Sequence, residues 1–332
     1  MSETLLDIKN LHVWFKVYGG VLKVLNGVNF NVKIGEKVGL VGEAGCGKTT
    51  TMKALLRVLP NLALIPEGDI FVRGKNILKL NSRELADLRG RGLSMIFQDP
   101  TSALNPVFTI GQQLDDIIKY SAGSSGQKVA NKKNIALSAL HEACLPDPER
   151  MLDSYPIQLS GGMRQRVCIA FAIATARDLL IADEPTTNLD VTIQDQVLRL
   201  IKDLVEKKGA SLILITHSLG LARETTERVY VMYAGNMIEM AATSLLFKKP
   251  FHPYTQGLLA SVPRLSGGDF AEGIPGRIPN YRNPPPGCRF APRCPYAFAP
   301  CTKAMPPLID VDDGHQVACY LYQNGQEDRR NA

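Results

Sequence analysis

The chain of 332 residues lacks a long apolar run, and its first residues lack the pattern of a secretory leader. No stretch approaches the roughly 18 consecutive apolar residues that a membrane-spanning helix requires, so we do not expect the chain to cross a bilayer by itself. Residues 1–7 lack a basic part followed by an apolar part, so we expect no signal peptide and a cytosolic compartment. In that compartment we expect no disulfides among the seven cysteines.

Long blocks of lysine or arginine are also absent, although the formal net charge is +6. The excess favours an anionic partner such as a nucleotide or a membrane surface, and it does not by itself indicate nucleic acid. Apolar residues make up 45% of the chain and charged residues 21%, which is ordinary for a globular protein. The length predicts one large core with a smaller unit attached.

Strand-like and helix-like segments alternate through the first 250 residues. The apolar and β-branched runs predict strands over residues 6–17, 21–32, 38–41, 93–97, 179–182 and 211–216. Helices are predicted over residues 48–59, 81–91, much of 110–152 apart from a loop at 121–126, and 162–175. This alternation is typical of an α/β fold with a mainly parallel sheet. Beyond about Pro250, proline, glycine and arginine become dense, which predicts a small appended module.

Residues 42–49 read Gly-Glu-Ala-Gly-Cys-Gly-Lys-Thr and match the phosphate-loop pattern G-x-x-x-x-G-K-[ST]. They follow the apolar run at 38–41, so a strand leads into a glycine-rich turn and the turn into a helix. The backbone N–H groups of such a turn and the partly positive helix N-terminus bind polyphosphates. We expect Lys48 to reach the β- and γ-phosphates and the Thr49 hydroxyl to reach Mg²⁺.

Asp183 and Glu184 follow the apolar run at 179–182. A carboxylate at such a strand end can hold Mg²⁺ through water, while the next carboxylate orients or polarises a water near the γ-phosphate. We therefore interpret Asp183 as the residue associated with Mg²⁺ and Glu184 as the catalytic base.

Residues 158–166 read Gln-Leu-Ser-Gly-Gly-Met-Arg-Gln-Arg, and a Ser-Gly-Gly turn at a helix start is another anion site because glycine has no Cβ. With Leu-Ser-Gly-Gly the chain resembles the ABC-type ATPases. Other motifs of that family occur in order around it. Gln98 matches the Q-loop glutamine, residues 187–190 (Thr-Asn-Leu-Asp) match the D-loop, and His217 matches the switch histidine.

The resemblance implies an α/β fold with an ABC-type ATPase domain over residues 1–250. This domain would contain a mixed or parallel sheet core, an antiparallel β subdomain and a helical subdomain at about 99–165, followed by an irregular Cys-rich module at 251–332. Glu184 and His217 would be catalytic, and Thr49, Gln98 and Asp183 would hold Mg²⁺. The implied nucleotide contacts are Phe15, Gly42, Glu43, Ala44, Gly45, Cys46, Gly47, Lys48, Thr49, Thr50, Gln98, Asp183, Ser160, Gly161 and Gly162.

Two positions leave alternatives open. Phe15 matches the aromatic residue that stacks on adenine in the family, but Trp14 and Tyr18 are nearby rivals for this contact. Ser218 departs from the family pattern, in which many members carry Asp after the switch histidine. Which residue would hold the His217 side chain in place is therefore left open.

Four cysteines near the end, Cys288, Cys294, Cys301 and Cys319, occur as C-x5-C-x6-C-x17-C. In a cytosolic protein four thiols favour a metal over disulfides, and four thiolates suit zinc or an iron–sulfur cluster. The close Cys pairs of structural zinc sites are absent, and Cys294 precedes a proline, as some cluster ligands do. From the residues alone a [4Fe–4S] cluster, Zn²⁺ and ordinary thiols all stay open.

The segment beyond residue 250 sharpens the resemblance. Residues 251–255 (Phe-His-Pro-Tyr-Thr), 274–276 (Ile-Pro-Gly) and the cysteine segment resemble the C-terminal extension of the dipeptide/oligopeptide importer ATPases. The resemblance then covers essentially the whole chain. In that family such cysteines are associated with a [4Fe–4S] cluster, so the resemblance implies one here.

The resemblance implies an ATP-hydrolysing subunit that powers uptake of dipeptides or oligopeptides. The implied partners are a paralogous ABC ATPase subunit paired head to tail, two integral-membrane permease subunits and, indirectly, an extracytoplasmic peptide-binding protein, with no nucleic acid. The implied location is peripheral, on the cytoplasmic face of the cell (inner) membrane. The alternatives are a non-transport ABC ATPase acting on nucleic acid or the ribosome, and a regulator in which ATP controls the cysteine module.

Overall fold

The structure is a computed structural model, which describes residues 3–121, 131–174, 177–187, 189–261, 273–312 and 314–323. The chain divides into two compact units. Unit 1 comprises Met1–Leu5, Val32–Glu36 and Asn76–Leu214, and unit 2 comprises Leu6–Asn31, Lys37–Lys75 and Ile215–Ala332. In the described residues no helix combines the length and the apolar character that a membrane crossing requires. The loop predicted at 121–126 lies, beyond Ser121, outside the described residues.

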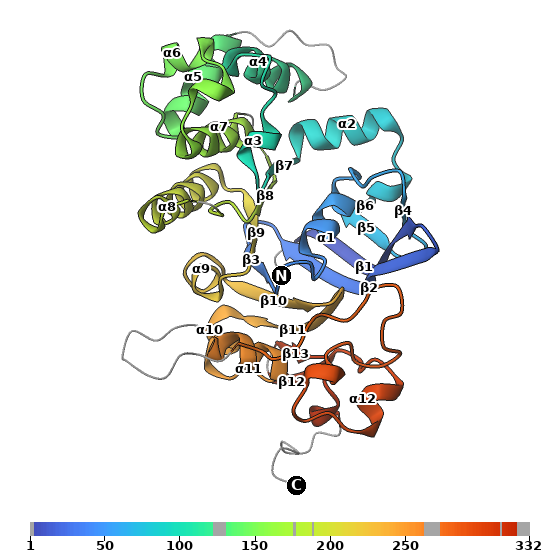
Figure 1. The fold of residues 1–332 in the computed structure, drawn as a ribbon. Helices are drawn as coiled ribbons and strands as arrows, with labels where there is room; N and C mark the ends of the chain where they lie inside the picture. Colours follow the sequence, from blue (N-terminus) through green and yellow to red (C-terminus); the bar gives the residue numbers. More distant parts are fainter. Residues whose placement is uncertain are drawn as a thin grey trace. The chain divides into compact units, whose positions relative to one another are not determined.

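Unit 1 is largely helical. Its helices are α2 (Ser82–Arg91), α3 (Pro100–Ala103), α4 (Ile110–Ser121), α5 (Lys132–Glu142), α6 (Pro148–Asp153), α7 (Gly161–Ile173) and α8 (Val191–Lys208), with short 3-10 helices at Ile77–Lys79 and Pro156–Gln158. Helices α4 to α7 pack on one another as one cluster, drawn in green in Figure 1. Helix α4 buries Ile110, Leu114 and Ile118 at intervals of four residues, which is the spacing of a single helix face.

The strands of unit 1 are short. They are β7 (Leu93–Ile96), β8 (Leu179–Asp183) and β9 (Ser211–Thr216), of which the last two residues fall in unit 2. Strands β7 and β8 pair in parallel, with Leu93 beside Leu179 and Ile96 beside Ala182, so their carboxyl ends coincide. Every residue of β8 and β9 is buried, as the continuous apolar runs predicted.

One sheet of unit 2 is formed mainly by the first 76 residues. Its strands are β1 (Thr4–Val17), β2 (Gly20–Lys33), β4 (Ala63–Leu64), β5 (Asp69–Val72) and β6 (Lys75–Asn76), in the order β2-β1-β5-β6 with β4 beside β1. Strand β1 is antiparallel to both β4 and β5. The two long strands that the sequence predicted on either side of Gly19-Gly20 are both present.

A second group of strands in unit 2 joins the phosphate-loop strand to the end of the chain. The strands are β3 (Lys37–Val41), β10 (Arg228–Tyr233), β11 (Asn236–Ala242), β12 (Ile309–Asp312) and β13 (His315–Val317), in the order β12-β13-β11-β10-β3. Strands β3 and β10 are parallel, and the other neighbours are antiparallel. The C-terminal residues therefore extend this sheet.

The helices of unit 2 are α1 (Lys48–Leu55), α9 (Leu219–Thr225), α10 (Thr243–Lys248), α11 (Pro253–Ala260) and α12 (Ala299–Lys303), with 3-10 helices at Ala291–Arg293 and Tyr320–Tyr322. Helix α1 ends four residues before the predicted Leu59. The physical reason is that Arg57 adopts a left-handed φ of +51°, which a helix does not continue through.

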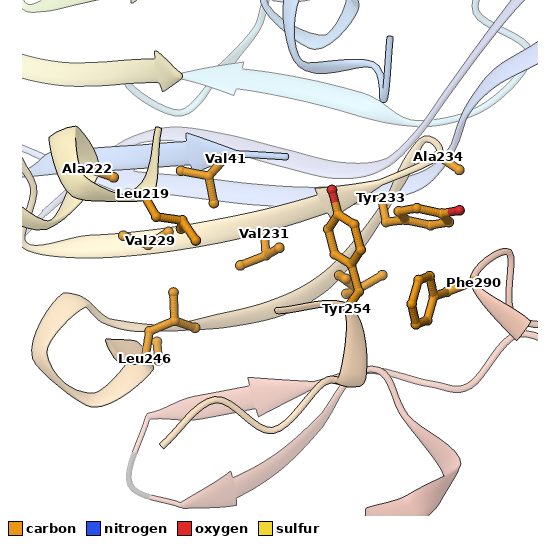
Figure 2. Close-up of a cluster of buried hydrophobic side chains, with 12 residues drawn as sticks. Val41, Leu219, Ala222, Val229, Val231, Tyr233, Ala234, Leu246, Tyr254 and Phe290 are labelled. Carbon is orange, nitrogen blue, oxygen red and sulfur yellow. The ribbon is translucent and has the colours of Figure 1, made fainter. Parts of the chain in front are cut away.

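A buried cluster in unit 2 connects the strand before the phosphate loop to the C-terminal segment. It includes Val41 of β3, Tyr233 of β10, Tyr254 of α11 and Phe290. Figure 2 shows the rings of Tyr233, Tyr254 and Phe290 together, and their centroids lie 4.6 to 5.5 Å apart. Aromatic rings at this spacing add specific contacts to the burial of apolar area. This cluster packs the strand that leads into the loop together with the C-terminal segment.

Candidate functional site

The phosphate loop, residues 42–49, follows the buried strand β3 and leads directly into α1. A Cβ on Gly42 would lie 2.2 Å from the Met232 carbonyl oxygen, which is closer than two such atoms approach. Gly47 has a φ of +112°, and a Cβ there would lie 2.7 Å from a methyl group of β2. Because glycine alone tolerates both restrictions, the two outer glycines of the motif are required by the packing of the loop itself.

Lys48 is the first residue of α1, and its side chain folds back over the loop. Its Nζ donates to the carbonyl oxygens of Gly42 at 2.7 Å and Glu43 at 3.0 Å, and the residue is buried. Among the described residues no side chain caps the first turn of α1, and that turn contains no acidic residue. A positive charge and a helix N-terminus therefore share one end of the loop, which suits a polyphosphate.

Three residues from much later in the chain bind the phosphate loop. The Tyr254 hydroxyl accepts a hydrogen bond from the Glu43 N–H at 2.9 Å, and the Tyr281 hydroxyl donates to the Gly45 carbonyl at 2.7 Å. Arg293 forms a bidentate ion pair with the Glu43 carboxylate at 2.8 and 3.1 Å. The sequence reasoning did not assign these three residues to the site. The available signal was that Tyr254 and Arg293 fall in or beside the segments that resemble the family extension.

Gln98 and Glu184 meet at the carboxyl ends of β7 and β8. Gln98 follows β7 by two residues, and Glu184 follows β8 directly, so the aligned register brings them together. The Gln98 Nε2 donates to the Glu184 Oε2 at 2.9 Å, and the Thr187 hydroxyl donates to the same oxygen at 3.2 Å. These two donors hold the carboxylate in one orientation.

The two predicted acidic residues differ in backbone and burial. Asp183 is the last residue of β8 and is buried. Glu184 has a φ of +46°, a left-handed conformation that is uncommon for a residue with a side chain. Such a conformation costs about 1 kcal/mol or more and persists only where neighbouring contacts enforce it. The unfavourable backbone conformation of Glu184 therefore indicates that neighbouring contacts fix the direction of its side chain.

The signature turn lies at the start of α7. Ser160 is its N-cap, and its hydroxyl accepts a hydrogen bond from the Met163 N–H at 3.3 Å. A Cβ on Gly161 would meet no described atom within 4 Å, and one on Gly162 would meet only the end of the Ile193 side chain at 3.8 Å. The packing of the described residues therefore does not require glycine at either position.

His217 and Ser218 follow strand β9, and His217 is exposed. Ser218 is the N-cap of α9, where its hydroxyl accepts from the Leu221 N–H at 3.5 Å and its own N–H donates to the Thr216 hydroxyl at 2.9 Å. Serine and aspartate are both good N-caps. This departure from the family pattern therefore preserves the start of the helix after His217. Asn188 of the D-loop lies outside the described residues.

The three aromatic residues considered for adenine stacking have different surroundings. Phe15 is half-buried on β1, where it pairs with Ala63. The ring of Trp14 lies 5.4 Å from the Lys23 ammonium group, and Tyr18 is fully exposed. The assignment of the adenine contact to Phe15 stays a prediction.

The predicted nucleotide-site residues fall into two groups, one in each unit. Unit 1 contains Gln98, Asp183, Glu184 and the signature turn, and unit 2 contains the phosphate loop with Thr49 and Thr50, Phe15 and His217. Within unit 1, Gln98 contacts Glu184 directly. Within unit 2, Lys48 contacts the loop carbonyls directly. That the residues of both groups contact one nucleotide stays a prediction.

The four C-terminal cysteines line one pocket in unit 2 and form no metal centre. The pocket leaves about 10 Å³ of space, roughly what one water molecule needs. Burial raises the pKa of Cys288 to about 11 and of Cys319 to about 12. Within the described residues no group of three or more His, Cys, Asp or Glu is arranged to hold a metal ion. The predicted iron–sulfur cluster on Cys288, Cys294, Cys301 and Cys319 is therefore wrong, and its zinc alternative has no site there either.

Comparison with protein families gives consecutive matches along the chain. A family described as ABC transporter matches residues 25–187, and one described as oligopeptide/dipeptide transporter, C-terminal region, matches residues 238–301. A third, described as an AAA domain, putative AbiEii toxin, type IV TA system, matches residues 155–223. With the phosphate loop, the acidic pair and the signature turn in order, the fold and the motifs define an ABC-type ATPase.

Known relatives match over nearly the whole chain. A probable peptide ABC transporter ATP-binding protein of Sinorhizobium fredii is 45% identical, over 96% of this chain and 95% of the relative. Bacillus subtilis has a dipeptide transport ATP-binding protein that is 44% identical, over 98% of this chain and 97% of the relative. The oligopeptide transport ATP-binding protein of Bacillus subtilis is 42% identical, over 96% of this chain and 88% of the relative. The chain belongs to the ATP-binding proteins of the dipeptide and oligopeptide ABC transporter family.

A solved structure supports the same fold. A dimeric ATP-binding cassette in a post-hydrolysis state with ADP and Pi has a TM-score of 0.64 and is 27% identical, over 72% of this chain and 98% of that chain. The predicted ABC ATPase fold and the predicted enzyme class, an ATPase, are thereby confirmed.

Proposed function

We propose that this chain binds and hydrolyses MgATP and thereby powers the import of dipeptides or oligopeptides through separate permease subunits. The observation that carries the proposal is the extent of the similarity. Relatives named as peptide, dipeptide and oligopeptide transport ATP-binding proteins match from the ATPase part through the C-terminal region. We retain residues 1–250 as the ATPase domain, with its helical subdomain at about 99–165, and residues 251–332 as the extension.

In unit 2 the phosphate loop would hold the triphosphate. The Lys48 ammonium group would exchange its bonds to the carbonyl oxygens of Gly42 and Glu43 for bonds to phosphate oxygens. The uncapped first turn of α1 would add backbone donors, and residues 42–50 would surround the phosphates. Phe15 would stack on the adenine, and His217 would contact the γ-phosphate.

In unit 1 the strand ends would supply the hydrolytic groups. The Asp183 carboxylate and the Gln98 amide, with the Thr49 hydroxyl of unit 2, are hard oxygen ligands of the kind that Mg²⁺ prefers. The bound ion would supply positive charge to the phosphate oxygens. Glu184, held by Gln98 and Thr187, would orient a water molecule and accept its proton.

The signature turn would act on a nucleotide bound to a second ATPase subunit. The packing of the described residues does not require glycine at Gly161. We therefore attribute the absence of a side chain there to a ligand that approaches the turn from outside the subunit. The facing ligand would be the γ-phosphate, received by Ser160, Gly161 and Gly162 at the start of α7. The solved relative is titled as dimeric, and for this chain we propose a paralogous ATPase partner.

The permease would contact unit 1. A groove of about 490 Å³ in that unit is mainly apolar, and α2, β7, α4 and α7 contribute to its lining. It includes Phe97, which is 41% exposed, and Tyr120, which is 77% exposed. An apolar groove between helices suits an amphipathic helix, and we assign it to a cytoplasmic helix of a permease subunit. The protein would then lie at the cytoplasmic face of the cell membrane as a peripheral subunit, with the extracytoplasmic peptide-binding protein contacting the complex only through the permease.

The proposal is tested by purifying the tagged chain from its native membranes. We expect permease subunits and a second ATPase subunit to co-purify, and peptide uptake by the cells to depend on the chain. Cells that lack the chain but import dipeptides and oligopeptides at the normal rate would contradict the transport role. The Lys48→Met variant is expected to lose MgATP binding in the purified protein, and normal binding would contradict the nucleotide site.

A further inference from the structure

The C-terminal segment holds the phosphate loop through an ion pair whose arginine is buried. Arg293 donates from both terminal nitrogens to the two carboxylate oxygens of Glu43, at 2.8 and 3.1 Å. Its remaining donors bind the carbonyl oxygens of Ile274 and Pro275 at 2.9 and 2.8 Å and the Tyr233 hydroxyl at 3.3 Å. The Arg293 side chain is 5% exposed. A guanidinium group with this many fixed partners has no alternative position within the segment.

Two tyrosine hydroxyls hold the backbone of the same loop. Tyr254 accepts from the Glu43 N–H, and its ring packs against those of Tyr233 and Phe290. Tyr281 donates to the Gly45 carbonyl. Burial raises the pKa of both hydroxyls, so they remain protonated. The second and fourth residues of the loop are thus tied to chain more than 200 positions away.

The negative charge of Glu43 would weaken phosphate binding at the loop if the ion pair with Arg293 did not neutralise it. Glu43 places a negative charge inside a loop that receives a polyphosphate, and a carboxylate near the phosphates would repel them. Arg293 cancels this charge, and the same guanidinium group is held by the carbonyl oxygens of Ile274 and Pro275.

We infer that Arg293, with Tyr254 and Tyr281, positions the phosphate loop for ATP, so that the C-terminal segment sets the nucleotide affinity of the ATPase domain. The inference rests on the proposed function, because it requires ATP to bind at this loop. The coupling is reciprocal: ATP binding stabilises the contacts between the loop and the C-terminal segment to the same extent.

The test measures MgATP affinity of the purified full chain by calorimetry. Arg293→Met is expected to weaken binding about tenfold, since it leaves the Glu43 charge uncancelled beside the phosphates. The double variant Arg293→Met with Glu43→Gln is expected to recover most of that loss. The loss in Arg293→Met is also expected to shrink at high ionic strength, because salt screens the repulsion. Lys303→Met, which removes an exposed positive charge from α12 of the same segment, serves as the matched control and should bind like the wild type.

Each outcome decides between electrostatic positioning and a merely structural role. Wild-type affinity in Arg293→Met overturns the inference. A loss that neither the Glu43→Gln change nor salt reduces also overturns it, since it would reflect damage to the fold. If Arg293→Met does not fold, Tyr281→Phe removes only the hydroxyl bound to Gly45, and unchanged affinity there overturns the inference. Lys48→Met separates the two proposals: if it binds MgATP normally, the proposed nucleotide site fails before the role of Arg293 is reached.

Discussion

At the scale of single residues, Glu184 combines strain with a fixed orientation. Its left-handed backbone is unfavourable, and two side chains hold the same carboxylate oxygen. Strained residues persist where the surrounding structure enforces them, and they cluster at functional sites. The contacts from Gln98 and Thr187 supply that enforcement. In its proposed role as the base, Glu184 held in this way would need little reorganisation when a water molecule reacts.

The Glu184→Gln variant tests the assigned role directly. It retains the side-chain volume and an oxygen for the Gln98 bond, but its amide does not accept a proton from water. We expect MgATP binding and subunit pairing to persist while the rate of hydrolysis falls by about 100-fold or more, as for loss of a general base. A phosphate-release assay under saturating ATP measures this.

The matched control is Glu142→Gln, which changes a carboxylate that pairs with Lys207 and Lys208 on the surface of unit 1. We expect that variant to hydrolyse ATP like the wild type. Undiminished turnover in Glu184→Gln would remove Glu184 from its role.

At the scale of elements, one buried carboxylate joins three parts of the C-terminal region. Glu239 of β11 is fully buried, and it accepts hydrogen bonds from the Phe251 and His252 N–H groups at 2.6 and 3.0 Å. Its Oε1 also lies 2.8 Å from the His315 Nε2 at the start of β13. The residue thus connects β11 to the start of α11 and to the strand that the C-terminal segment adds.

The Glu239→Gln variant should destabilise the protein. An amide places N–H groups against existing donors, so at least one buried donor loses its acceptor. We expect the free energy of unfolding to fall by about 2 kcal/mol or more, measured by urea denaturation. Glu227→Gln is the control, because Glu227 is 55% exposed in a surface pair with Lys37 and should change stability by less than about 0.5 kcal/mol. Equal urea denaturation midpoints for Glu239→Gln and Glu227→Gln would contradict the structural role of Glu239.

His252 makes the start of α11 sensitive to pH. Its Nδ1 accepts the Tyr254 N–H at 3.0 Å, so this nitrogen carries no proton in the folded state. Burial lowers the pKa of His252 to about 4, although the nearby Glu239 charge acts in the opposite direction. An unfolded histidine titrates near 6.5, so the unfolded chain binds a proton that the folded chain excludes.

Because the folded pKa of His252 is depressed, its contribution to stability is complete above about pH 6.5 and is lost as the pH falls toward 4. The loss is on the order of 3 kcal/mol. His252→Asn retains an acceptor for the Tyr254 N–H without a titratable ring. We therefore expect its unfolding free energy to decline less steeply than that of the wild type over this range, measured by denaturation at a series of pH values. Parallel pH profiles would contradict the prediction.

At the scale of the whole molecule, the proposed transport role depends on separate surfaces for separate partners. The phosphate loop and its C-terminal contacts belong to unit 2. The contact between Gln98 and Glu184, the signature turn and the apolar groove belong to unit 1. Nucleotide affinity and permease binding should therefore respond to different substitutions.

Tyr120→Asp tests this separation. It places a charge in the apolar groove, so we expect at least about tenfold less permease to co-purify while MgATP affinity stays unchanged. Leu62→Asp is the control, because Leu62 is 61% exposed and does not line the groove. Normal permease recovery with Tyr120→Asp would remove the groove from the interface.

Much of the architecture was predictable because its signals are local. The continuous apolar runs before Asp183 and before His217 predicted buried strands, and β8 and β9 confirm them. The strands on either side of Gly19-Gly20 followed from their β-rich composition. The end of α1 was missed by four residues, because the left-handed conformation of Arg57 has no marker in its residue type.

The C-terminal cysteines show where a spacing pattern fails. Their spacing left a metal centre open and the family resemblance implied one, but within the described residues no group of three or more His, Cys, Asp or Glu is arranged to hold a metal ion, and the pocket that the cysteines line leaves about 10 Å³. The spacing of the cysteines in the sequence constrains only which of them lie close together along the chain. The burial of the sulfur atoms and the volume between them depend on how distant segments pack.

The sequence by itself determined the family, the order of the motifs and the chemistry of the phosphate loop, because each depends on residues adjacent in the chain. The tertiary structure alone decided that Arg293, Tyr254 and Tyr281 hold that loop and that Gln98 and Thr187 orient Glu184. The physical reason is that most of these contacts join groups from separate segments of the chain, and their geometry is set by strand register and core packing, which no local pattern encodes.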